Sequence, residues 1–151
     1  MQPSYRQIRV LVADDSRTAL RSVCEYLEFE GWFDIVGTAA DGLQAVHKAE
    51  QVRPELVLAD LSMPQMTGLE AAKELRKSCP ELRILIFTGL NGACLRDECL
   101  RWGADGLVEK SQMPEGLMEE VRKLFPKISG VVEGPIAQEF FRKRAPSEHG
   151  G

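Results

Sequence analysis

The chain has 151 residues, of which 44% are hydrophobic and 28% charged, and its formal net charge is -4. These values are typical of a single soluble globular domain and give no whole-chain argument for binding nucleic acid. No apolar run approaches the roughly 20 residues of a membrane span, and the first residues lack the apolar stretch of a signal peptide, so we expect a soluble, cytoplasmic protein without membrane association.

The first predicted strand and helix frame a pair of acids. Residues 8–13 form an apolar run that predicts a strand, and Asp14 and Asp15 follow it directly. Ser16 can then cap a helix whose apolar residues recur at helical spacing, and Gly31 ends that helix. The acid pair is therefore expected at the carboxyl end of the first strand.

A second strand, a second helix and a third strand follow. Residues 33–37 are shorter and more polar than the first strand, as at the edge of a sheet. Asp41 caps a helix that Pro54 prevents from continuing. The apolar run 56–59 predicts a strand buried on both faces, and it ends in Asp60.

Cap and stop signals locate the third helix and the fourth strand. Thr67 and Glu70 have the spacing of a capping box, so a helix begins there, and Pro80 stops it. The apolar strand predicted over residues 82–87 ends in Thr88.

The last two predicted helices flank a weaker strand. Asn91 caps the fourth helix and Gly103 ends it. Residues 105–109 form a fifth strand that leads into Lys110, and Pro114 lies in the first turn of a fifth helix.

Five strands that alternate with five helices predict an α/β fold. We expect a doubly wound, five-stranded parallel sheet with helices on both faces, in three layers joined by right-handed crossovers. The domain is expected to span residues 8–126, after an N-terminal arm over 1–7 and before a C-terminal tail or linker over 127–151. The tail contains one basic and aromatic cluster, residues 140–144, which we interpret as the end of a short helix or an arm rather than a partner contact.

Polar side chains follow four of the strands at the same end. They are Asp14 and Asp15 after the first strand, Asp60 after the third, Thr88 after the fourth and Lys110 after the fifth. The carboxyl ends of parallel strands share one edge, where open α/β sheets bind ligands. Carboxylates about 4 Å apart repel by roughly 4 kcal/mol per pair at a surface-like dielectric, so the cluster favours a cation. Because the donors are oxygens only, the preferred ion is Mg²⁺, or Mn²⁺, and Lys110 adds a point charge suited to a phosphoryl group.

The four cysteines give no sign of another metal. Cys24, Cys79, Cys94 and Cys99 include no C-x-x-C pair and no nearby histidine at zinc-ligand spacing. We therefore expect free, mostly buried thiols rather than a zinc site or a redox pair.

Several motifs, in this order, resemble the receiver domain of two-component response regulators, the CheY-like family. They are Asp14-Asp15, the segment from Asp60 to Gly68 with its Met63-Pro64 pair, Thr88-Gly89, residues 103–106 and Lys110. The resemblance covers about residues 8–125 and implies the flavodoxin-like strand order 2-1-3-4-5.

The resemblance implies a role for each residue of the acidic site. Asp60 is expected to accept a phosphoryl group from the phosphohistidine of a sensor histidine kinase or a phosphotransfer protein, giving an acyl phosphate. Asp15, Asp60 and the main-chain carbonyl of Ser62 are expected to bind Mg²⁺ directly, and Asp14 mainly through bound water. Lys110 is expected to pair with Asp60 before transfer and with the phosphoryl group afterwards.

The resemblance also implies a switch. The phosphoryl group is expected to draw in the hydroxyl of Thr88, which joins Asp60 and Lys110 in the catalytic set, and to shift the surface of the fourth helix, fifth strand and fifth helix. Leu107, the second switch position, stands where the family usually has an aromatic residue, and Ser111 stands where a proline is common. The peptide bond between Lys110 and Ser111 is therefore not expected to be cis.

The output that these features imply is a switched partner-binding face rather than enzymatic turnover, since the domain would catalyse only its own phosphorylation and dephosphorylation. The downstream protein target or fused output domain does not follow from the sequence, and a phosphorylation-dependent homodimer stays open. One alternative is the receiver half of a transcription factor whose DNA-binding domain is absent, because the residues after Lys127 are too few for a helix-turn-helix domain and no direct nucleic-acid binding is expected. Another is a flavin carrier or small hydrolase on the same fold, but no Gly-rich phosphate loop follows the first strand and no G-x-S-x-G motif occurs.

Overall fold

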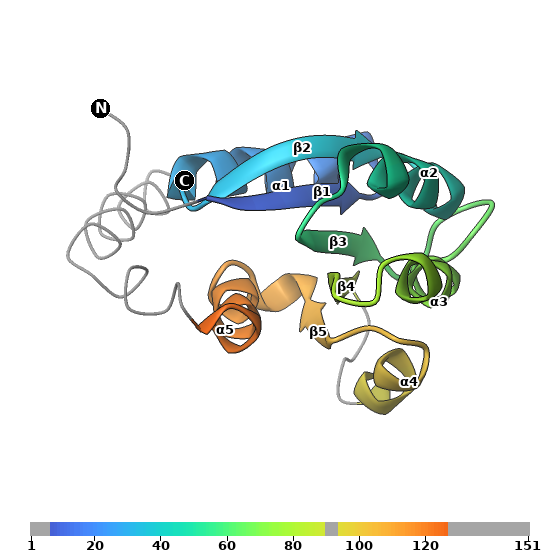
Figure 1. Cartoon of the computed structure of the whole chain (residues 1–151). Helices are drawn as coiled ribbons and strands as arrows, with labels where there is room; N and C mark the ends of the chain where they lie inside the picture. Colours follow the sequence, from blue (N-terminus) through green and yellow to red (C-terminus); the bar gives the residue numbers. More distant parts are fainter. Residues whose placement is uncertain (1–6, 90–93, 127–151) are drawn as a thin grey trace.

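Five parallel strands lie side by side in the order β2-β1-β3-β4-β5. They are β1 (Ile8–Ala13), β2 (Phe33–Ala39), β3 (Leu56–Asp60), β4 (Arg83–Thr88) and β5 (Gly106–Glu109). This computed structural model describes residues 7–89 and 94–126, and Figure 1 shows the twisted sheet with its flanking helices. The predicted strand order is confirmed, with β2 at one edge of the sheet.

Helices follow each strand of the sheet in turn. They are α1 (Arg17–Glu30), α2 (Gly42–Val52), α3 (Gly68–Ser78), α4 (Arg96–Arg101) and α5 (Glu115–Leu124), with a 3₁₀ turn, η2 (Lys110–Gln112), before α5. No helix within residues 7–89 and 94–126 is long and apolar enough to cross a membrane. The predicted three layers are confirmed, because apolar side chains pack on both faces of the sheet.

The two faces of the sheet carry separate apolar layers. On one face, α1 and α5 pack against side chains such as Leu58 and Phe87. On the other face, α2, α3 and α4 pack against Val57, Ile84 and Ile86. Successive residues of a strand point to opposite faces, so the strands buried on both faces read as continuous apolar runs in the sequence.

The helix caps that the sequence indicates are present. The side chain of Ser16 caps α1, and Oδ1 of Asp41 accepts a hydrogen bond from the N–H of Gln44 at 2.8 Å. Thr67 and Glu70 form both bonds of a capping box, at 3.2 and 2.9 Å. These local bonds fix where three of the helices begin.

Some boundaries differ from the predicted ones. β2 continues to Ala39, because it pairs with β1 beyond residue 37. α4 begins at Arg96, and the predicted cap Asn91 lies outside the described residues. Pro114 precedes α5 as its N-cap, and the Met113–Pro114 bond is cis. It is the one cis bond among the described residues, so the expectation that the bond between Lys110 and Ser111 is not cis is confirmed.

The cysteines are less buried than predicted. Only Cys99 is buried, whereas Cys24 and Cys79 are half-buried and Cys94 is exposed. The expectation of mostly buried thiols was therefore wrong, because Cys24 and Cys79 only border the apolar layers. The thiols are free, as expected.

Arg76 ties the end of α3 to the segment between α4 and β5. Its guanidinium donates to the carbonyls of Pro80, Leu82 and Gly103 at 2.6 to 3.0 Å. It also pairs with the carboxylate of Asp105 at 2.7 Å. The same Asp105 oxygen accepts a bond from the N–H of Ile84 at 2.8 Å, and β5 therefore begins one residue later than predicted.

Candidate functional site

The predicted acidic residues meet at the carboxyl edge of the sheet. One carboxylate oxygen each of Asp14, Asp15 and Asp60 lies within 4.8 Å of the other two. The Nζ atom of Lys110, which follows β5, lies 3.2 Å from Oδ2 of Asp14 and 3.3 Å from Oδ1 of Asp60. Residues up to 96 positions apart are therefore brought together, as the sheet order requires.

The three carboxylates differ in their surroundings. Asp14 is 2% exposed and Asp60 8%, whereas Asp15 is exposed to solvent. The N–H of Ser16 donates to Oδ1 of Asp14 at 2.9 Å, which fixes this carboxylate beside Lys110. The cluster is thus closed on its Asp14 side and open on its Asp15 side.

The charges of the cluster perturb one another. Burial raises the pKa of Asp60, and the negative charge of Asp14 raises it further, against the opposing effect of Lys110. Burial alone would lower the pKa of Lys110, but its bonds and charge interactions with Asp14 and Asp60 raise it on balance. Lys110 therefore stays cationic at neutral pH. Its single positive charge does not neutralise the negative charge of three carboxylates.

We predict that Asp60→Asn stabilises the protein at neutral pH in the presence of a chelator, by a net amount on the order of 1 kcal/mol, because the relief of carboxylate repulsion is partly offset by the lost attraction to Lys110. The folded-state pKa of Asp60 lies above its ordinary value of 3.8. The wild-type protein therefore loses stability as the pH rises through the folded-state pKa. Urea unfolding of both proteins between pH 4 and 8 measures this, and the gap between them should widen with pH. A gap that shrinks with rising pH would contradict the prediction.

The donor set of the cluster fits a hard divalent cation. Three carboxylates offer oxygen ligands close together, and within the described residues no histidine or cysteine joins them. Oxygen-only sites of this kind suit Mg²⁺ or Mn²⁺. The excess negative charge that raises the pKa of Asp60 would be relieved by such an ion.

The loop after Asp60 is held in a strained conformation. The N–H of Met66 donates to the carbonyl of Pro64 at 2.7 Å, closing a three-residue γ-turn. At its centre, Gln65 has a φ of 67°, which non-glycine residues rarely adopt. Within this loop the side chain of Met63 is buried, whereas Ser62 is exposed beside Asp60. Nothing in the sequence marked this turn, since Gln65 is not a usual left-handed residue.

The two predicted switch residues are both buried. Thr88 is 1% exposed at the end of β4, and Leu107 is 6% exposed on β5. Leu107 packs in the layer of α2, α3 and α4. Ile86, two residues before Thr88 on the same strand, belongs to that layer too, so strand alternation directs both switch positions to the same face.

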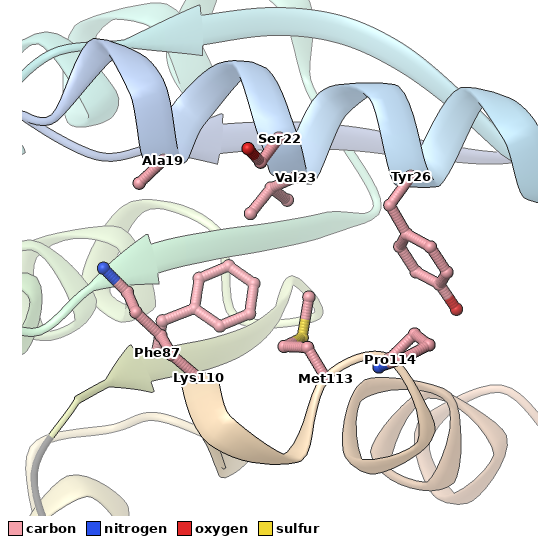
Figure 2. Close-up of a pocket in the computed structure, with 8 residues that line it drawn as sticks. All are labelled: Ala19, Ser22, Val23, Tyr26, Phe87, Lys110, Met113 and Pro114. Carbon is pink, nitrogen blue, oxygen red and sulfur yellow. The ribbon is translucent and has the colours of Figure 1, made fainter. Parts of the chain in front are cut away.

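An apolar groove of about 310 Å³ adjoins the acidic site. Figure 2 shows its walls, with α1 on one side and the segment before α5 on the other. The lining residues are Ala19, Ser22, Val23, Tyr26, Phe87, Lys110, Met113 and Pro114. Because Lys110 belongs to both the groove and the carboxylate cluster, a molecule in the groove would lie next to Asp60.

Comparisons with known proteins agree with this geometry. A family model described as the response regulator receiver domain matches residues 10–122. The chain is 28% identical over 116 residues to the chemotaxis protein CheY of Thermotoga maritima, and the match covers 77% of this chain and 96% of that protein. A solved structure, the CheX-CheY-BeF3-Mg+2 complex from Borrelia burgdorferi, has a TM-score of 0.73 at 25% identity, over 80% of this chain and 90% of that one.

Other relatives are much longer than this chain. A protein-glutamate methylesterase/protein-glutamine glutaminase of Nocardioides sp. is 36% identical over 131 residues, which are 83% of this chain but 36% of that protein. The chain spans the same fraction of two further esterases of this kind, from Trichodesmium erythraeum and Methanococcoides burtonii. Similar sequences therefore occur both alone and as one part of larger proteins.

Proposed function

The chain belongs to the response regulator receiver domain family, and on that premise we propose that Asp60 accepts a phosphoryl group from a phosphohistidine and thereby switches a partner-binding face. The observation that carries this proposal is the contact of Lys110 with Asp60 inside a cluster of three carboxylates. A lone acid at the end of a strand would have no such support.

The chemistry proposed for Asp60 is a single phosphoryl transfer. A carboxylate oxygen of Asp60 bonds to phosphorus as the bond from phosphorus to the imidazole nitrogen breaks, and the histidine, protonated on its other ring nitrogen, leaves as neutral imidazole with that electron pair. Such a transfer needs positioning and charge neutralisation more than covalent help. Lys110, 3.3 Å from Oδ1 of Asp60, is close enough to neutralise charge on the incoming oxygens. Thr88, buried at the next strand end, is proposed as the hydroxyl that senses the product.

The metal ligands are also proposed. Asp14, Asp15, Asp60 and the main-chain carbonyl of Ser62 would hold Mg²⁺, or Mn²⁺, with Asp14 acting mainly through water. When bound, the ion would supply positive charge for the transferred phosphoryl oxygens. The burial of Asp14 and the exposure of Asp15 support these unequal roles.

The donor is proposed to be a sensor histidine kinase or a phosphotransfer protein in the cytoplasm. Such a donor has to place its histidine within bonding distance of Asp60, and the groove between α1 and α5 offers apolar surface beside Lys110. An apolar side chain of the donor in that groove would orient the histidine toward the carboxylate.

The output is proposed to be a surface of α4, β5 and α5 whose conformation depends on phosphorylation. The alternative is that the chain is the receiver half of a transcription factor, with its DNA-binding domain elsewhere in a longer protein. A further possibility within the first proposal is a homodimer that forms on phosphorylation. The reading frame beyond codon 151 and light scattering with and without beryllofluoride would separate these outputs.

The proposed function is tested by labelling the purified protein with radioactive acetyl phosphate. We expect label that requires Mg²⁺ or Mn²⁺, is lost in excess chelator, and is released by hydroxylamine as an acyl phosphate is. Borohydride reduction followed by peptide mass spectrometry should locate the modified residue at Asp60. Label that appears without a divalent ion, or on another residue, would contradict the proposal.

A further inference from the structure

The first turn of α2 presses against the loop that follows Asp60. A Cβ atom built on Gly42 would lie 2.0 Å from the carbonyl oxygen of Met66 and 2.7 Å from its carbonyl carbon and Cβ. Real Cβ atoms do not come this close to backbone atoms, so only glycine fits at this position. The contact joins the start of α2 to the loop before α3.

The other end of the same loop is held just as closely. A Cβ atom on Gly68 would lie 2.3 Å from the carbonyl oxygen of Asp60. The N–H of Gly68 donates to the carbonyl of Leu61 at 3.0 Å, and the N–H of Leu61 donates to the carbonyl of Phe87 at 2.8 Å. The loop over residues 61–67 is therefore closed by a hydrogen bond between its two ends and held at Met66 by Gly42.

The turn that supports the loop is itself rigid. Oδ1 of Asp41 accepts from the N–H of Gln44 at 2.8 Å, and Oε1 of Gln44 accepts from the N–H of Ala40 at 2.9 Å. Gly42 is buried, and the next turn of α2 places Ala45 and Val46 in the apolar layer below the loop. A rigid support of this kind can hold a strained loop, and the γ-turn at Gln65 is such a loop.

We propose that Gly42 is a positioning residue for the phosphoacceptor site, because it lets α2 hold the loop of residues 61–67 at the place where Ser62 can present its main-chain carbonyl to the metal. This inference rests on the proposed function for the role of Ser62, but the contact between Gly42 and Met66 does not depend on it. Gly42 itself touches no reacting atom.

The test compares Gly42→Ala with Gly116→Ala in the full chain. The three atoms nearest to a Cβ on Gly116, in α5, would be side-chain atoms, the closest being Cβ of Gln112 at 3.1 Å. Nuclear magnetic resonance in chelator reports the amide shifts of loop residues 61–63 and 65–67, and a titration then gives the Kd for Mg²⁺. We expect Gly42→Ala to move those amides and to weaken Mg²⁺ binding about tenfold or more, and Gly116→Ala to change the Kd by less than about twofold.

A second variant covers the case in which Gly42→Ala does not fold. Asp41→Ala removes the cap bond from the first turn of α2 without a steric clash, a loss that folded domains usually tolerate. We expect the protein to stay folded and to bind Mg²⁺ about threefold more weakly, with the same loop amides shifted. A saturating Mg²⁺ concentration should then restore most of the labelling rate, as expected of a positioning defect.

Wild-type loop shifts and Kd values in a folded Gly42→Ala protein would overturn the inference. If that variant does not fold, unchanged values in Asp41→Ala would do so. A failure of the proposed function looks different, because the wild-type protein itself would then take no Mg²⁺ or no label at Asp60. In that case the loop amides measured in chelator still decide whether Gly42 positions the loop.

Discussion

Asp60→Asn is expected to abolish phosphoryl acceptance from acetyl phosphate, although the protein stays folded. The amide has no ionised oxygen to attack phosphorus, and it removes one of the three carboxylates of the cluster. Loss of the nucleophile should reduce label to background at every Mg²⁺ concentration, whereas loss of a metal ligand alone would be partly overcome by more Mg²⁺. Incorporation of label after matched incubation of both proteins measures the effect.

The control for this substitution is Asp34→Asn, which neutralises an exposed carboxylate on the edge strand β2. We expect Asp34→Asn to take label at the wild-type rate. Label that persists in Asp60→Asn would exclude Asp60 as the acceptor. Equal losses in both variants would indicate that net charge, and not the acidic site, governs the reaction.

Arg76→Ala is expected to lower the free energy of unfolding by about 3 kcal/mol, because it leaves Asp105 without its cation and three carbonyls without a donor. In a domain of this size that corresponds to a fall of roughly 10 °C in the unfolding temperature. The side chain of Arg76 is 27% exposed, so solvent recovers part of the cost and larger losses are not expected. Calorimetry in chelator measures the effect.

Lys77→Ala is the matched control for Arg76→Ala, on the same turn of α3. Lys77 contacts Glu74 at 3.5 Å with both side chains well exposed, and such pairs contribute about 0 to 1 kcal/mol. Arg76→Lys should restore little of the stability that Arg76→Ala loses. A lysine ammonium cannot donate to several carbonyls at once as the planar guanidinium does. If Arg76→Ala unfolds at the temperature of Lys77→Ala, the guanidinium contacts do not stabilise the fold.

Most of the fold and the centre of the site followed from local signals. Each strand is an apolar run, and caps such as Ser16, Asp41 and Thr67 act within three residues along the chain. The acidic site could be predicted because parallel strands end at one edge, which converts strand order into proximity. Asp60 and Lys110 therefore lie together as expected, although no sequence pattern predicted the distance between them or the difference in exposure between Asp14 and Asp15.

What the sequence could not predict depends on contacts between distant segments. Arg76 reaches Asp105 across 29 positions, and nothing near either residue marks the pair. Gly42 follows the predicted cap Asp41, and no sequence pattern indicates its contact with the carbonyl of Met66. The turn at Gln65 follows from the supports on both sides of it rather than from the residue's own preference. All three features depend on tertiary packing.

The sheet separates the groove beside Lys110 from the two proposed switch residues. The groove beside Lys110 lies between α1 and α5, whereas Thr88 and Leu107 belong by strand alternation to the side of α3 and α4. The proposed output surface also includes α5, which packs on the same face of the sheet as the groove. A donor protein in the groove and a target on α4, β5 and α5 would therefore meet neighbouring surfaces, and we expect a target in excess to slow transfer from the donor.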